Sequence, residues 1–195
     1  MTSDVDRQRL LQMARHAMVA HVTGCAPTAE VFGSEPLDRC GGAFVTIHRH
    51  GELRGCIGHL EATALLTRVI RECAVAACSA DPRFQPVGDV ELPDLEIELS
   101  LLGPFEPISS PAEFEVGRHG LVVERHRLRG LLLPQVATEW EWDRETFLAQ
   151  TCHKAGLPRD AWRHGAKIWR FEAEVFSDAR FPDVNPPSRS TREGR

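Results

Sequence analysis

Tyrosine is absent from this chain of 195 residues, so no phenol can serve as a general acid. The six cysteines include no Cys-x-x-Cys pair, which argues against a thioredoxin-like redox centre and a paired zinc knuckle. No stretch approaches the roughly 18 apolar residues of a membrane span. The first residues lack the basic and apolar regions of a signal peptide. We therefore expect a cytoplasmic protein with reduced cysteines.

Signatures of common enzyme classes are also missing. There is no Gly-x-Gly-x-x-Gly fingerprint of a dinucleotide-binding fold, and no Gly-x-Ser-x-Gly elbow of a serine hydrolase. No cofactor is indicated. The net charge of −5 and the pI of about 6.0 argue against a nucleic-acid-binding protein.

The hydrophobic patterns predict hairpins with helices between them. Helices are expected near residues 3–21, 63–80 and 143–155, and strands near residues 43–47, 52–58, 95–101, 121–125, 128–133 and 169–175. This order favours an α+β fold, with mostly antiparallel sheet and flanking helices. We expect one domain over residues 1–178. Residues 179–195, rich in proline, arginine and serine, are predicted to form a disordered tail.

The most informative segment is residues 53–58, with the sequence Leu-Arg-Gly-Cys-Ile-Gly. In an extended strand, residues i and i+2 share a face, so Arg54, Cys56 and Gly58 would line one face. A guanidinium beside a thiol stabilises the thiolate, and glycines let another group approach the backbone. Cys56 is therefore a candidate nucleophile. The alternative is a small thiol that only packs in the interior.

Arginine inside an apolar, glycine-rich strand needs a partner if it is buried. For Arg54, that partner could be a carboxylate of the protein, or a carboxylate or phosphate of a ligand. Both alternatives stay open. The run Asp81-Pro82-Arg83-Phe84 either ends the preceding helix or places Arg83 at the same site as Arg54.

The register of the first hairpin decides what lies beside Cys56. A two-residue loop would pair Cys56 with Val45. A three-residue loop would place Thr46 opposite Arg54. We favour the second register, because only this one puts a hydroxyl beside the arginine.

Metal binding is not indicated at this hairpin. Cys56-x-x-His59 has half the spacing of a zinc site. However, residues i and i+3 of a strand point to opposite faces, so the two side chains would not share one metal.

Several blocks, in this order, resemble the AMMECR-one domain family. They are Phe44-Val45-Thr46-Ile47, the run at 53–58, Asp81-Pro82-Arg83-Phe84, Ile97-Glu98-Leu99-Ser100, Gly120-Leu121-Val122-Val123, Leu133-Pro134-Gln135-Val136-Ala137 and Lys154-Ala155-Gly156-Leu157. The likeness spans about residues 8–178. Bacterial members resemble protein A of the AmmeMemoRadiSam system, which is named for a Memo-like protein and a radical SAM protein encoded nearby.

The resemblance implies two unequal lobes with the run at 53–58 near the cleft between them, but it implies no reaction. Two hypotheses follow. In the first, Cys56 is a thiolate and Arg54 an anion-binding group, and a small anionic ligand contacts Gly55, Gly58, Thr46 and Arg83. In the second, the chain is a non-catalytic binding or adaptor protein for a Memo-like or radical SAM partner, in an RNA or small-molecule modification pathway. The sequence does not decide whether the protein is an enzyme.

Overall fold

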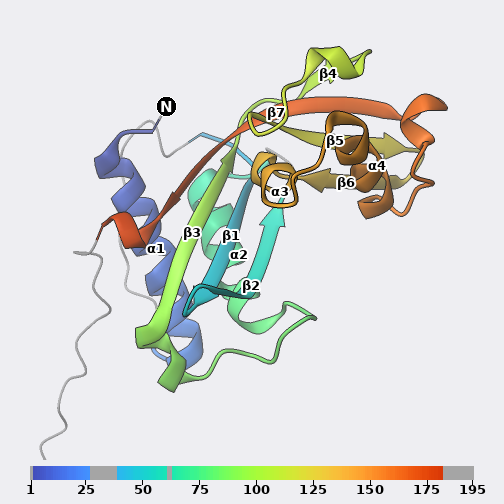
Figure 1. The fold of residues 1–195 in the computed structure, drawn as a ribbon. Helices are drawn as coiled ribbons and strands as arrows, with labels where there is room; N and C mark the ends of the chain where they lie inside the picture. Colours follow the sequence, from blue (N-terminus) through green and yellow to red (C-terminus); the bar gives the residue numbers. More distant parts are fainter. Residues whose placement is uncertain (1, 27–38, 61–62, 182–195) are drawn as a thin grey trace, which may run out of the picture. The chain divides into compact units, whose positions relative to one another are not determined.

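The computed structural model describes residues 2–26, 39–60 and 63–181. Its contacts divide the chain into two compact units (Figure 1). Unit 1 comprises Met1–Leu101 and Val175–Arg195, and unit 2 is the continuous segment Leu102–Glu174. Unit 2 is thus inserted into the sequence of unit 1. None of the helices within the described ranges is both long and apolar enough to cross a membrane.

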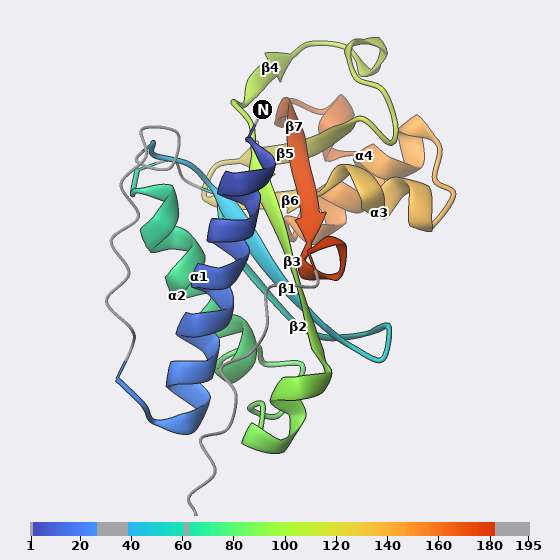
Figure 2. The ribbon, with the colours of Figure 1, turned by 90° about the vertical axis from the view of Figure 1, so that its left-hand side faces the viewer.

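Unit 1 is built on an antiparallel sheet in the strand order β2-β1-β3. Its elements are α1 (Asp4–Thr23), β1 (Ala43–Arg49), β2 (Glu52–His59), α2 (Leu66–Ser79), η1 (Asp89–Asp94), β3 (Leu95–Leu102), the end of β7 (Lys167–Ser177) and η4 (Asp178–Arg180). Both long helices lie on one side of the sheet (Figure 2). Alternate strand residues, including Val45, Ile47, Ile97 and Leu99, form the core with these helices.

Ser3 caps the start of α1. The Ser3 hydroxyl accepts a hydrogen bond from the backbone N–H of Asp6 at 3.2 Å and donates one to the Asp6 carboxylate at 2.6 Å. The helix then presents a buried apolar stripe that includes Leu10, Leu11 and Met18. The helix predicted near residues 3–21 is confirmed.

A buried ion pair joins α1 to η4 within unit 1. The Arg15 guanidinium donates to the Asp178 carboxylate and, at 2.7 Å, to the backbone carbonyl of Leu95. The other Asp178 oxygen accepts the N–H of Ile97 at 3.0 Å. The ordered chain therefore continues through η4, past the predicted start of the tail at residue 179. The remainder of that tail, residues 182–195, lies outside the described residues.

Unit 2 is an antiparallel sheet in the strand order β4-β7-β5-β6. Its elements are β4 (Glu106–Ile108), η2 (Pro111–Glu113), β5 (His119–Arg125), β6 (Leu128–Leu132), α3 (Pro134–Glu139), α4 (Arg144–Lys154), η3 (Ala161–Arg163) and most of β7. Its core contains Phe114, Leu121, Val123, Phe147 and Leu148. The helix predicted near residues 143–155 is confirmed, and Asp143 caps it by accepting the N–H of Thr146 at 2.7 Å.

The α+β class and the mostly antiparallel sheet are thus confirmed. The sequence reading missed two short elements. Strand β4 has three residues, one of them Pro107, and is too short to show alternation. Helix α3 begins at Pro134, directly after the strand predicted near residues 128–133, and proline is favoured in the first turn of a helix.

Candidate functional site

The β1–β2 hairpin has a register that neither prediction anticipated. Its loop contains two residues, His50 and Gly51, both with positive φ (53° and 82°), as tight hairpin turns require. The register then shifts by one between Ile47 and His48, which leaves Arg54 as the extra residue of a β-bulge. Beyond the bulge, Thr46 lies opposite Cys56. The hydroxyl is therefore beside the thiol, and the prediction that it lies opposite Arg54 is wrong.

Cys56 is half-buried and makes contacts through its side chain and its backbone. The Thr46 hydroxyl donates a hydrogen bond to Cys56 Sγ at 3.3 Å. The N–H of Cys56 donates to Asp81 Oδ2 at 2.8 Å, and its carbonyl accepts from Arg83 Nη2 at 3.4 Å. Asp81 and Arg83 therefore satisfy the backbone polar groups of Cys56 that β1 does not use.

The Arg83 side chain is held in place by Asp81. Arg83 Nε and Nη2 donate to the two Asp81 carboxylate oxygens at 3.0 and 2.7 Å. Hydrogen bonding from the Arg83 side chain, with a further hydrogen bond from the N–H of Cys56, holds the pKa of the Asp81 carboxyl well below its usual range. The same bond is the main reason why the pKa of Arg83 is raised, and the neighbouring Cys56 sulfur adds to the rise. Arg83 is thus a cation beside the Cys56 sulfur.

Arg54 has a partner inside the protein. Its Nε and Nη2 donate to the two carboxylate oxygens of Glu91 at 2.9 and 3.0 Å. Arg54 Nη1 donates to the backbone carbonyl of Gln85 at 2.9 Å, and Nη2 also donates to that of Pro86 at 3.4 Å. The Arg54 side chain is only 17% exposed. Of the two alternatives left open by the sequence, the structure selects the internal carboxylate.

Glu91 is the residue of this region that sequence reasoning missed. Besides Arg54, it accepts from Arg49 at 3.2 Å and from the N–H of Gly88 at 2.9 Å. The hydrogen bond with Arg54 is the largest cause that lowers the pKa of Glu91, to about 2. In the sequence, the role of Glu91 is indicated only by its position three residues after Gly88. With 28 acidic residues in the chain, nothing singled it out.

The two glycines of the run do not leave room for a ligand, contrary to the prediction. A β-carbon at Gly55 would lie 2.2 Å from the carbonyl oxygen of Ala77 on α2. At Gly58, the equivalent space is filled by the ring of Phe44 at 2.3 Å. Both glycines therefore serve close packing within unit 1.

We expect Gly55→Ala to lower the free energy of unfolding by about 2 kcal/mol, because the methyl group would force β2 away from α2. Urea denaturation would measure the loss. Gly41→Ala is the matched control, since its β-carbon would meet only Leu66 Cδ1 at an ordinary 3.5 Å. Equal stability of the two variants would contradict the packing role of Gly55.

The other described cysteines differ in accessibility. Burial raises the pKa of Cys73 and of Cys78 to about 11, which keeps both as thiols at neutral pH. Cys152 is also buried, whereas Cys25 and Cys40 are exposed. Among the described residues, no group of three or more His, Cys, Asp or Glu is arranged to hold a metal ion.

The family model AMMECR1 matches residues 11–176. The chain belongs to the AMMECR1 family. A relative from Methanothermobacter thermautotrophicus is 49% identical over 144 residues, which cover 70% of this chain and 75% of the relative. A relative from Thermococcus onnurineus is 43% identical over 181 residues, which cover 87% of this chain and 88% of the relative.

A solved structure of the uncharacterised protein PH0010 from Pyrococcus horikoshii is similar to this AMMECR1-family chain. The TM-score is 0.81 at 38% sequence identity, over 87% of this chain and 90% of the other. The names of these relatives state no activity, ligand or partner. Membership of the AMMECR1 family therefore supports the fold but specifies no activity.

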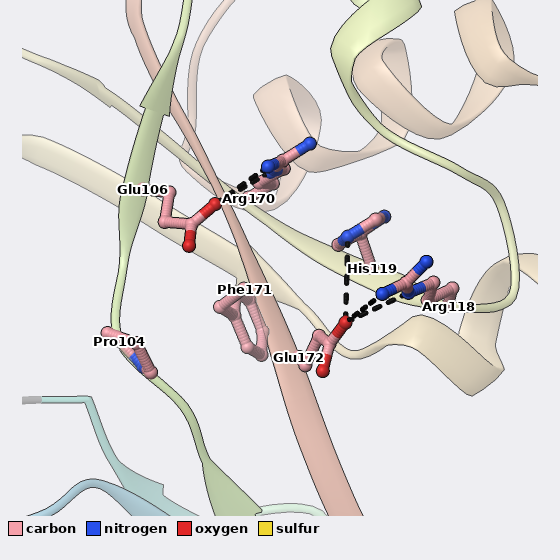
Figure 3. A pocket seen from close by; sticks show the side chains of 7 residues that line it. All are labelled: Pro104, Glu106, Arg118, His119, Arg170, Phe171 and Glu172. Carbon is pink, nitrogen blue, oxygen red and sulfur yellow. Dashed lines mark hydrogen bonds and ion pairs between the residues drawn. The ribbon is translucent and has the colours of Figure 1, made fainter.

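This AMMECR1-family chain also has a hollow of about 290 Å³ within unit 2 (Figure 3). Its lining consists of Pro104, Glu106, Arg118, His119, Arg170, Phe171 and Glu172. The charged groups pair with one another, Arg170 with Glu106 at 2.8 Å and Arg118 with Glu172 at 2.8 Å. Because these charges are already matched, the hollow does not indicate a class of ligand.

Proposed function

We propose that Cys56 is a reactive thiolate in unit 1 and that Arg83, in place of Arg54, supplies the positive charge beside it. The observation that carries the proposal is the 3.3 Å hydrogen bond from the Thr46 hydroxyl to a half-buried sulfur. A hydroxyl donor and a nearby guanidinium both favour the charged form of a thiol. A thiolate is a stronger nucleophile than the neutral thiol.

The arrangement around Arg83 favours an anionic ligand. Asp81 occupies Nε and Nη2 of the guanidinium, Nη2 also donates to the Cys56 carbonyl, and Nη1 donates to no oxygen within the described part of the chain. The side chain is 53% exposed. A carboxylate or phosphate of the ligand could therefore bind Nη1 while an electrophilic atom lies near Cys56 Sγ. In this proposal, Thr46 orients the sulfur, and Gly55 and Gly58 have no contact with the ligand.

Iodoacetamide labelling, read at each cysteine by mass spectrometry between pH 6 and 9, tests the proposal. At pH 7, we expect Cys56 to react faster than an unstructured cysteine peptide, although it is half-buried. Arg83→Gln should slow labelling of Cys56 about tenfold, which corresponds to about 1.4 kcal/mol. Thr46→Val should slow it about threefold. Arg68→Gln is the matched control, because it removes an exposed arginine that pairs with Glu72.

Labelling of Cys25 and Cys40 gives an internal reference for exposed thiols in the same sample. The thiolate role is lost if Cys56 reacts no faster than the peptide and Arg83→Gln leaves its rate unchanged. The remaining alternative would then be a non-catalytic adaptor for a Memo-like or radical SAM protein. A pull-down with each protein at micromolar concentration would check it.

A further inference from the structure

Unit 2 exposes a pair of stacked tryptophans between α3 and α4. Trp140 is 67% exposed, which is unusual for so large an apolar side chain. Its ring stacks on Trp142, with the ring centroids 6.2 Å apart and an interplanar angle of 21°. Trp142 in turn packs against the core of unit 2. One indole is therefore anchored, and it supports the other at the surface.

The turn that presents Trp140 is held by its own hydrogen bonds. The N–H of Trp140 donates to Val136 at 3.2 Å, and that of Glu141 donates to Thr138 at 3.2 Å. The N–H of Trp142 donates to the carbonyl of Ala137 at 2.8 Å. A rigid aromatic surface of this kind loses little conformational entropy when a partner binds.

Three acidic residues alternate with the two tryptophans in the sequence. Residues 139–143, which we call the Trp140 patch, read Glu-Trp-Glu-Trp-Asp. Within the described residues, Glu139 and Glu141 are exposed and form no ion pair. Hydrogen bonds with Thr146, first with its side chain and then with its backbone N–H, lower the pKa of the Asp143 carboxyl. The patch thus combines an exposed aromatic ring with three carboxyl side chains.

We propose that the Trp140 patch is a docking surface for an arginine-rich segment of a partner protein. A flat guanidinium can stack on the indole while its N–H groups donate to carboxylates beside it. The chain uses this contact internally, since the Arg163 guanidinium lies 4.5 Å from the ring centroid of Trp162. Nucleic acids and anionic membranes are disfavoured, because like charges would face each other. This inference is independent of the thiolate proposed at Cys56.

Titration of the full chain with octa-arginine, followed by calorimetry, tests the proposal. We expect Trp140→Ala to weaken binding about tenfold, and Trp140→Phe to weaken it less because a smaller ring remains. The double variant Glu139→Gln/Glu141→Gln should weaken binding about fivefold and reduce its dependence on salt. Octa-lysine should bind more weakly than octa-arginine, and octa-glutamate should not bind.

The double variant Glu52→Gln/Asp89→Asn is the control, because it changes the net charge equally at exposed residues outside the Trp140 patch. It should alter affinity less than twofold. The proposal is overturned if this control weakens binding as much as Glu139→Gln/Glu141→Gln, since net charge alone would then explain the binding. It is also overturned if both Trp140 variants bind octa-arginine like the wild type, or if Trp140 is needed for binding RNA or anionic vesicles instead.

Discussion

Asp178→Asn should lower the free energy of unfolding by about 3–5 kcal/mol, the cost of leaving a buried charge without its partner. The Arg15 and Asp178 side chains are only 6% and 7% exposed. Asparagine preserves the shape but not the charge, so the Arg15 guanidinium would remain buried without a counter-ion. The amide could also not accept both Arg15 and the N–H of Ile97 as the carboxylate does.

Thermal and urea denaturation would measure this effect. The control is Glu145→Gln, which removes the negative charge from an ion pair with Arg163 that lies at the surface, with a distance of 2.7 Å. We expect that change to cost less than about 1 kcal/mol. If both variants lose the same small amount, the Arg15–Asp178 pair does not stabilise unit 1 as argued.

Glu91→Gln should lower the free energy of unfolding by about 3 kcal/mol at pH 7, because the pKa of Glu91 falls from its ordinary value of 4.5 to about 2 in the folded protein. Arg54 and Arg49 would both lose the carboxylate they share. The effect is expected in unit 1, where Glu91 also caps the N–H of Gly88.

The same shift predicts how stability depends on pH. A carboxyl with a lowered pKa in the folded state contributes stability that is fully present above its unfolded value, near 4.5. That contribution is lost as the pH falls towards 2, so wild type and Glu91→Gln should converge in acid. Denaturation at several pH values between 7 and 2 would show this. A constant difference, independent of pH, would mean that the Glu91 charge is not its source.

Much of the fold was predictable because local signals and packing agree. Ser3 and Asp143 cap their helices, and the strand pattern at residues 95–101 alternates as a half-buried strand should. Shorter elements such as β4 contain too few residues to show a period. Helix α3 was hidden because Pro134 fits both the end of a strand and the start of a helix.

The sequence singled out some residues of the candidate site but not the contacts between them. Cys56, Thr46 and Arg83 were all singled out, and the structure brings them together. A β-bulge adds one residue to a strand without a clear mark in the sequence, and this one exchanged the neighbours of Cys56 and Arg54. Pairing Arg54 with Glu91 required a contact over 37 positions, which a single sequence cannot select.

The position of Asp178 has a consequence for the growing polypeptide. Arg15 and Asp178 are separated by 163 positions, and all of unit 2 lies between them. On the ribosome, the chain of unit 2 is therefore complete before Arg15 can meet its carboxylate. Since domains generally fold as their chains become available, the inserted unit 2 can fold first, and unit 1, whose first segment is synthesised before unit 2, is completed after it.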